Sequence, residues 1–96
     1  MRNYELVFIV HPDLDDNAFT DVCNRIKSWI KDFDGTIVKE DHWGKRRMAY
    51  SINKQRDGHY MMFTMQLDSE RVPELERNMR MLESVIRFMT VRKDEE

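Results

Sequence analysis

The segment Tyr4-Glu5-Leu6-Val7-Phe8-Ile9-Val10 predicts a β-strand that is apolar on both of its faces. Its β-branched and aromatic residues favour an extended backbone. Alternation places Leu6, Phe8 and Val10 on one face and Glu5, Val7 and Ile9 on the other. Because both faces are largely apolar, we expect a central strand whose second face meets something other than bulk water.

After the turn His11-Pro12-Asp13, the sequence predicts an amphipathic helix over about residues 15 to 33. An acid at position 13, 15 or 16 can cap its N-terminus, and Gly35 is placed to cap its C-terminus. We interpret Cys23 as a small core residue because it lies on the apolar stripe. That stripe contains Phe19, Val22, Cys23, Ile26, Trp29, Ile30 and Phe33.

Residues 36–67 predict two strands that form a long hairpin with a basic tip. The first strand starts at residues 36–38 and runs towards Trp43. Gly44 interrupts it, which indicates a bulge or a bend, and strand character resumes over residues 48–52. The polar segment 53–58 ends in Asp57-Gly58, a turn signal. The next strand covers residues 59–67 and alternates between apolar and mixed positions.

A second helix and a last strand complete the predicted elements. Asp68 or Ser69 can open the helix, and Pro73 is tolerable only in its first turn. The strand covers residues 85–92. The buried stripe of the helix contains Val72, Leu75, Met79 and Leu82.

The element order is therefore β-α-β-β-α-β, which predicts an α+β, ferredoxin-like fold with two helices on one face of a four-stranded antiparallel sheet. We expect a single domain over residues 1–93 and a disordered acidic end at 94–96. The sheet face without helices would be apolar, a candidate interaction surface, although a bulge at Gly44 could reverse part of this assignment. Its members would be Val7, Ile9, Tyr60, Met62, Met89 and Val91.

A basic run stands out from a chain whose formal net charge is -2. From Lys45 to Arg56 there are five cations and no acid. A local positive patch on a slightly acidic body is the electrostatic footprint of a nucleic-acid site, and arginine forks fit phosphate oxygens. Trp43 and Tyr50 offer flat faces for stacking at the two ends of the densest part. Taken alone, such a run is more often a solvated loop.

The sequence carries no convincing catalytic, metal or cofactor constellation. Its three histidines are scattered, and we expect each to be solvated. One cysteine excludes an internal disulfide framework and a multi-cysteine zinc site. No Walker or GxGxxG motif is present, so we expect no enzyme and no cofactor. No segment is apolar enough to span a bilayer and no signal-peptide pattern opens the chain, which predicts a cytosolic protein.

Two alternatives share the predicted fold. The first is a single-strand reader of the RNA-recognition type, which stacks bases on aromatic side chains of its first and third strands. Gly58 and Tyr60 match that motif faintly, but methionines occupy stacking positions. The second is a protein-interaction module whose basic hairpin pairs with an acidic partner without RNA.

The run Gly44-Lys45-Arg46-Arg47-Met48-Ala49-Tyr50-Ser51-Ile52-Asn53-Lys54 resembles the signature of the bacterial small-subunit ribosomal protein six family. The resemblance extends from Arg2 to Lys93. Met48 stands where leucine is usual and Ser51 where proline is frequent, and both keep the shape. Further matches are Tyr4-Glu5, Pro12, Trp43, Gly58-x-Tyr60 and Val85-Ile86-Arg87-x-Met89-x-Val91.

The resemblance implies a structural, non-catalytic protein of the cytoplasmic ribosome. Such a protein binds the central domain of small-subunit ribosomal RNA as a heterodimer with small-subunit ribosomal protein eighteen, and it assists subunit assembly. No membrane, small-molecule substrate, cofactor or metal is implied. The candidates for RNA backbone contact are Arg2, Lys45, Arg46, Arg47, Lys54, Arg56, Arg87 and Arg92, of which Arg46, Arg47 and Arg87 match the family pattern best. From the apolar sheet face, the candidates for the protein partner are Trp43, Met48, Tyr50, Tyr60 and Met62.

Overall fold

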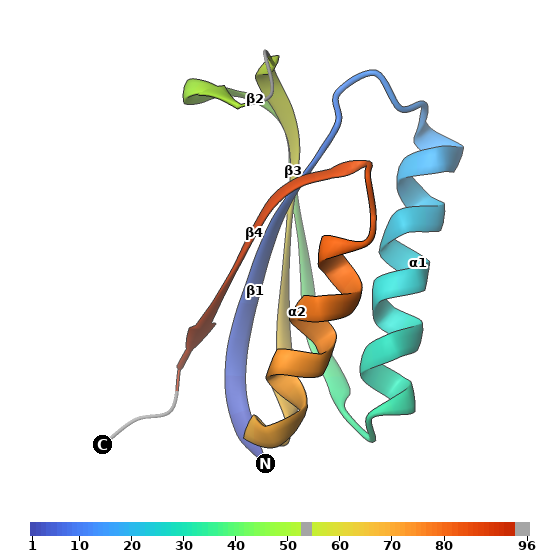
Figure 1. The fold of residues 1–96 in the computed structure, drawn as a ribbon, viewed down its shortest axis with the longest axis vertical. Coiled ribbons are helices and arrows are strands. Elements are labelled where there is room, and N and C mark those ends of the chain that lie inside the picture. The colour runs from blue at the N-terminus through green and yellow to red at the C-terminus, as the bar shows by residue number, and fades with distance from the viewer. Residues whose placement is uncertain (53–54, 94–96) are drawn as a thin grey trace.

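A four-stranded antiparallel sheet carries both helices on one of its faces (Figure 1). The computed structural model describes the backbone at residues 1–52 and 55–93, and the side chains at residues 1–48 and 57–93. The predictions made for Lys54 and for the acidic end at 94–96 therefore lie outside the described residues, as do those for the side chains of Tyr50 and Arg56.

The element order confirms the predicted ferredoxin-like fold. The strands lie in the order β2-β3-β1-β4, so the strand that comes first in the chain is central. The elements are β1 (Arg2–Val10), α1 (Asp16–Asp32), β2 (Thr36–Ile52), β3 (Gln55–Leu67), a 3-10 turn η1 (Ser69–Arg71), α2 (Val72–Arg80) and β4 (Val85–Arg92).

The core lies between the sheet and the two helices, and β1 supplies its centre. Leu6, Phe8 and Val10 are fully buried on the helix-facing side, as the alternation of the sequence predicts. Phe8 meets Phe63 of β3 edge to face, with ring centroids 5.2 Å apart. The buried side chains of α1 are the predicted ones, since Phe19, Cys23, Ile26 and Ile30 share one stripe.

Side-chain caps define where both helical segments begin. Asp15 is the N-cap of α1, and its carboxylate accepts a 2.8 Å hydrogen bond from the backbone N–H of Ala18. Asp68 caps η1 in the same way through the N–H of Glu70. Pro73 stands in the first turn of α2, where its missing N–H leaves no helical bond unmade.

The C-terminus of α1 is capped by Asp34 and Gly35 together, where the sequence predicts a cap at Gly35. Asp34 takes the left-handed conformation, with φ at 64°. The N–H groups of Asp34 and Gly35 donate to the carbonyls of Lys31 and Ile30, which is the Schellman arrangement. Gly35 is needed for space, because a Cβ there would lie 2.8 Å from Cδ1 of Leu67.

The prediction of a turn at Asp57-Gly58 is wrong. Both residues lie inside β3, and the pairing of β2 with β3 extends to Ile52 and Gln55. Gly58 serves close packing in the sheet, because a Cβ at this position would lie 2.2 Å from Cγ2 of Ile9. A glycine in a sequence can thus mark a crowded strand as well as a turn.

Candidate nucleic-acid and protein interface

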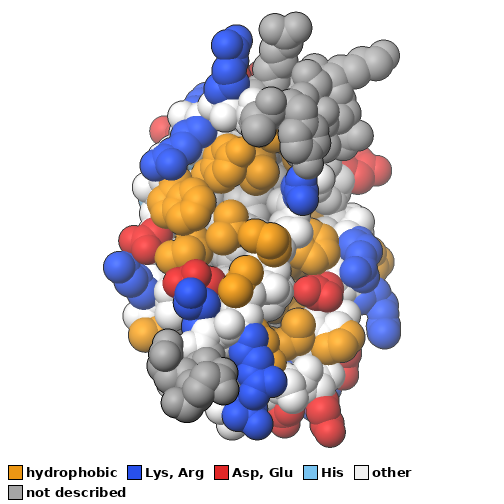
Figure 2. Space-filling view, turned by 90° about the vertical axis from the view of Figure 1, so that its left-hand side faces the viewer, with side chains coloured by type: hydrophobic (Ala, Val, Ile, Leu, Met, Phe, Trp, Pro, Cys, Tyr) orange, Lys and Arg blue, Asp and Glu red, His pale blue; other side chains and the backbone are white. Residues whose placement is uncertain are grey.

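The sheet face without helices, here called the open face, is apolar at its centre (Figure 2). Its side chains come from alternate positions of β3, β1 and β4, which the strand register aligns into rows. Met89 is the most exposed of the apolar side chains on these three strands, with 53% of its surface accessible. The first row contains Tyr60, Ile9 and Arg87, and the second contains Met62, Val7 and Met89.

Charged side chains surround this apolar centre (Figure 2). Lys39 lies 3.6 Å from Asp41 along β2. Glu5, which follows the two apolar rows on β1, lies 3.9 Å from Nζ of Lys93. The open face therefore combines an apolar middle with a polar rim, the usual anatomy of a protein interface.

Two aromatic rings extend the open face across the edge strand β2. The rings of Trp43 and Tyr60 are stacked, with centroids 6.1 Å apart and an interplanar angle of 22°. The guanidinium of Arg46 lies over the Trp43 ring, 5.4 Å from its centroid. Its Nε also donates a 3.3 Å hydrogen bond to the backbone carbonyl of Trp43. An aromatic pair and a cation thus form one unit at this edge.

A bulge at Gly44 produces this arrangement. The register between β2 and β3 shifts between His42 and Gly44, and Gly44 has φ at 83°. This is the left-handed region that glycine adopts without steric cost, so the predicted bulge is confirmed. Beyond the bulge, Gly44 pairs with Tyr60, and the pairing of β2 with β3 then continues without a shift to Arg47 and Asp57.

The basic run does not form one continuous patch. Arg46 pairs with Gly58 and shares the open face, whereas Lys45 pairs with His59 and Arg47 with Asp57. Alternation directs Lys45 and Arg47 to the opposite face of the hairpin. Cations that are adjacent in the sequence therefore lie on two opposite faces of the hairpin.

Met48 has the same parity as Arg46 and lies on the side of the open face, but its side chain is almost fully covered. Only 6% of its surface is accessible, and its sulfur lies 3.6 Å from the position that a Cβ of Gly58 would occupy. Ile9 lies on the open face as expected but is also buried, because it packs over Gly58. Met48 thus leaves little surface for a partner at this corner.

The remaining predicted cations are divided between the two ends of the sheet. Arg87 lies in the first row of the open face. Arg2 and Arg92 have the parity of the helix-facing side and lie at the end of the sheet where the chain begins (Figure 1). At about 3.3 Å per residue, the length of β1 separates Arg2 from the end of the sheet where Val10 pairs with His59 by roughly 26 Å. All three are exposed.

His59 contradicts the expectation that each histidine is solvated. It is buried, with its ring stacked on that of Phe19 at a centroid distance of 3.6 Å, and its Nε2 lies 2.5 Å from Nε2 of His42. Burial lowers the pKa of His59, and the nearby His42 and Lys45 lower it further, against a smaller opposing effect of Asp16. The sequence held a signal for this burial, because His59 lies two residues before the buried Met61 and strand alternation puts both on the same face of the sheet.

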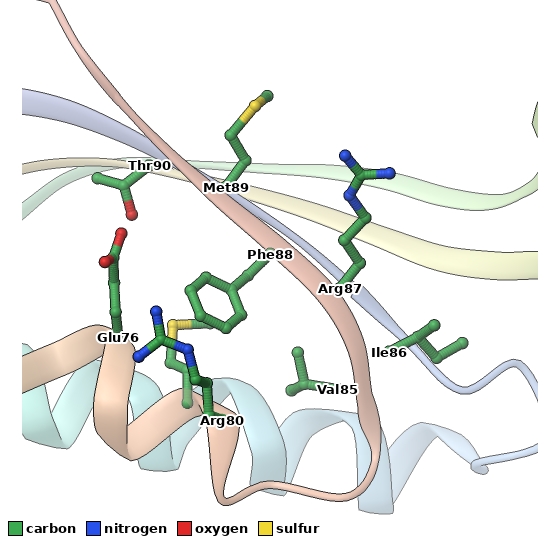
Figure 3. Close-up of a pocket in the computed structure, with 9 residues that line it drawn as sticks. Glu76, Arg80, Val85, Ile86, Arg87, Phe88, Met89 and Thr90 are labelled. Atoms are coloured by element: carbon green, nitrogen blue, oxygen red, sulfur yellow. The ribbon is translucent and has the colours of Figure 1, made fainter. Parts of the chain in front are cut away.

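A groove of about 600 Å³ lies between α2 and the edge strand β4 (Figure 3). Arg80 of α2 covers the ring of Phe88, 5.8 Å from its centroid. The hydroxyl of Thr90 is buried and has no hydrogen-bond partner among the described residues. Figure 3 shows Glu76 and Arg80 reaching from the helix towards the strand, whereas Arg87 and Met89 point away to the other side.

Within the described part of the chain, no group of three or more histidine, cysteine or acidic residues could hold a metal ion. The thiol of Cys23 is unsuited to chemistry, because burial raises its pKa to about 11. No helix among the described residues is long and apolar enough to cross a membrane.

Comparison with known proteins identifies this arrangement. The family model described as Ribosomal protein S6 matches residues 3–92. The chain belongs to the ribosomal protein S6 family. The signature around the Gly44 bulge and the apolar open face are thus features of a ribosomal protein S6 sequence.

Curated members of the ribosomal protein S6 family match over nearly the full chain. "Small ribosomal subunit protein bS6" of Moorella thermoacetica is 40% identical over 100% of this chain and 98% of its own length. The protein of the same name from Carboxydothermus hydrogenoformans is 37% identical over 98% of both chains. The crystal structure of 30S ribosomal protein S6 from Thermotoga maritima superposes with a TM-score of 0.91 at 31% identity, covering 96% of this chain and 87% of the other.

Membership of the ribosomal protein S6 family settles the class of the protein. The family is structural and not catalytic, which confirms the prediction that the chain is not an enzyme. The chain is a structural constituent of the small ribosomal subunit and belongs to the cytoplasmic ribosome. The resemblance inferred from the signature is likewise confirmed.

Proposed function

We propose that this chain binds small-subunit ribosomal RNA of the central domain together with small-subunit ribosomal protein eighteen, and thereby assists assembly of the subunit. The proposal rests on membership of the ribosomal protein S6 family and on the chemistry of the open face. An apolar centre suits a protein partner, and a cationic perimeter suits phosphate.

The observation that carries the proposal is the apolar open face with cations at its rim (Figure 2). Met89, the most exposed apolar side chain on β1, β3 and β4, is uncharged and flexible, which suits a packed protein contact. Arg46 and Arg87 border this centre on the same face. A protein seated on the centre would therefore lie next to RNA held at the rim, and the two contacts would cooperate.

Under this proposal the cations contact RNA, and the apolar and aromatic residues contact protein eighteen. RNA backbone contact is assigned to Arg2, Lys45, Arg46, Arg47, Lys54, Arg56, Arg87 and Arg92. Contact with protein eighteen is assigned to Trp43, Tyr50, Tyr60 and Met62, with the buried Met48 packed on the same side of the sheet. Cations on both faces of the hairpin suit an RNA junction, in which two helices can approach one protein element from different sides.

Recognition would be of RNA shape. Side chains do not read the deep, narrow major groove of A-form RNA, whereas phosphates are accessible along the whole helix. Each phosphate neutralised adds roughly 0.7 to 0.9 to the magnitude of the slope of log affinity against log salt concentration. The salt slope therefore counts the cations that are engaged.

The test is a titration of the purified chain into a central-domain fragment of small-subunit ribosomal RNA, with and without protein eighteen, at several salt concentrations. We expect tight, salt-sensitive binding that protein eighteen strengthens. Two control arms use an acidic protein and an unpaired oligonucleotide. Binding to either control with no binding to the fragment would overturn the proposal.

A further inference from the structure

We infer that the stacked rings of Trp43 and Tyr60 position Arg46 as a preformed phosphate-binding fork, so that the aromatic pair contributes to RNA affinity without touching RNA. This inference rests on the proposed function, because it assigns a role within the RNA contact. It goes beyond that proposal by making Trp43 and Tyr60 positioning residues for a cation.

The geometry of Arg46 carries the inference. Its guanidinium is held from two directions, by the Trp43 ring at 5.4 Å and by the Trp43 carbonyl, which accepts a 3.3 Å hydrogen bond from Nε. With Nε engaged, the donors that remain are those on the two terminal nitrogens. Two parallel N–H donors on one edge match two phosphate oxygens. The contact with Trp43 thus leaves the phosphate-binding edge unoccupied by that residue.

The Trp43 ring is itself held in place. It stacks on Tyr60 of β3 at 6.1 Å, and Tyr60 belongs to the row that β1 and β4 continue across the sheet. The bulge at Gly44 brings Trp43 into this position. The φ of Gly44, 83°, allows the register between β2 and β3 to shift at the tryptophan. The platform for the arginine is therefore anchored in the regular sheet, although Arg46 itself lies in an exposed edge strand.

The advantage is entropic. A free arginine side chain must be ordered when it binds, and the usual cost of ordering one flexible side chain at an interface corresponds to roughly a two- to twelvefold loss of affinity. A cation over an aromatic face is attracted to the ring before RNA arrives, so part of this cost is met in the free protein. Lys45 and Arg47 point to the other face of the hairpin and do not share this platform.

The variants that test the inference are Trp43→Leu, Arg46→Ala and, as a control, Met81→Leu. Trp43→Leu keeps every charge but removes the ring under Arg46. Met81→Leu changes an exposed apolar side chain at the end of α2, away from the open face. Each variant is combined with protein eighteen and titrated into the central-domain RNA fragment over a salt series, and each is also titrated without protein eighteen.

We expect Trp43→Leu to weaken RNA binding by roughly two- to twelvefold with an unchanged salt slope, because Arg46 would still reach its phosphate. Met81→Leu should bind as the unsubstituted chain does. Arg46→Ala should lower the magnitude of the slope by roughly 0.7 to 0.9. An effect of Trp43→Leu that appears only when protein eighteen is present would limit Trp43 to its assigned partner contact and overturn the inference.

A measurement on the free protein separates this inference from the proposed function. In a nuclear magnetic resonance spectrum of the RNA-free chain, the Nε–H of Arg46 should exchange slowly with solvent, and Trp43→Leu should abolish this protection. Fast exchange in the unsubstituted chain would overturn the inference even if RNA binds. If the unsubstituted chain shows slow exchange but binds no RNA with or without protein eighteen, the proposed function fails and the inference fails with it.

Discussion

The three glycines of this chain are needed for different structural reasons, and these reasons can be read only from the surroundings of each glycine. Gly44 needs its positive φ, whereas a Cβ there would meet nothing within 4 Å. Gly58 has crowded surroundings and lies within a strand, so it needs the absence of a side chain. The two positions should therefore respond to different substitutions.

Gly58→Ala should lower the free energy of unfolding by about 1–3 kcal/mol, the usual cost of overpacking. The reason is the 2.2 Å approach to Cγ2 of Ile9. Urea unfolding measures the loss. The double variant Gly58→Ala with Ile9→Ala should lose less stability than the sum of the losses of the two single variants, because the smaller side chain at position 9 removes the clash. Strictly additive losses would show that Ile9 is not the obstacle.

Asp34→Gly should raise the free energy of unfolding by about 0.5–1 kcal/mol. Asp34 occupies the left-handed position that follows α1, where glycine has no steric penalty. Thermal and urea unfolding both report the change. Asp32→Gly, inside the last turn of the same helix, is the matched control because it removes the same charge, and it should give no comparable gain, since glycine is a poorer helix former than aspartate. A destabilised Asp34→Gly variant would contradict this account of the cap.

At the scale of elements, the contact between α1 and the hairpin is polar at its upper end. Phe19 of α1 stacks on His59 of β3, and His42 of β2 completes the cluster. Below it, Lys27 of α1 pairs with Glu40 of β2 at 3.1 Å. The helix and the edge strand are therefore joined by aromatic, polar and charged groups, in contrast to the apolar core beneath β1 and β3.

Stability should fall in acid because of His59. Its folded-state pKa lies below the ordinary 6.5, first because of burial and then because of His42 and Lys45. The unfolded chain therefore binds the proton more readily, so the stabilisation is complete above pH 6.5 and is lost as the pH falls through the folded-state pKa. Urea unfolding from pH 7.5 to pH 5 measures this slope.

His59→Gln should reduce that pH dependence, although it also costs stability at neutral pH because the stacked ring is lost. His11→Gln is the control, since His11 lies in the turn after β1 and outside this cluster. An unchanged slope in the His59 variant would show that the acid sensitivity has another source.

At the scale of the whole molecule, two surfaces are separated by the sheet. The helices cover one face, and the open face presents apolar side chains with cations around them (Figures 1 and 2). Of the cations in the basic run, Arg46 faces the apolar centre, while Lys45 and Arg47 face away. An RNA that engages both sets must surround the edge of β2.

Combined Arg46→Ala and Arg47→Ala substitution should weaken RNA binding and lower the magnitude of the salt slope by roughly 1.4 to 1.8, twice the single-phosphate value. The melting temperature should not change, because neither side chain belongs to the core. Filter binding and thermal unfolding measure the two effects. Normal RNA binding by the double variant would remove the basic run from the interface.

Met89→Glu should abolish the heterodimer with protein eighteen and leave folding intact. The side chain is 53% exposed on the open face, where it continues the apolar row of Met62 and Val7 onto β4, so a carboxylate there stays solvated in the free chain but would be desolvated under a partner. Calorimetric titration measures the affinity. Met81→Glu is the matched control, since Met81 is 76% exposed at the end of α2, away from this face. Equal affinities for the two variants would exclude the open face.

Much of the fold could be predicted because its signals are local. The stripe of α1 and the alternation of β1 and β3 each repeat within a few residues and agree with the observed burial. The bulge at Gly44 was predictable for the same reason, since a lone glycine interrupts a strand pattern. The signature residues also sufficed to recognise the family.

The sequence by itself thus determined the order of elements, the core-facing sides of the strands and the family. Only the tertiary structure decided that Gly58 belongs to a strand and that Arg46 faces a different side from Lys45 and Arg47. The physical reason is that these outcomes depend on how the strands pair with one another. Shifting one strand by one residue exchanges its two faces, and no local pattern records which register the packed sheet selects.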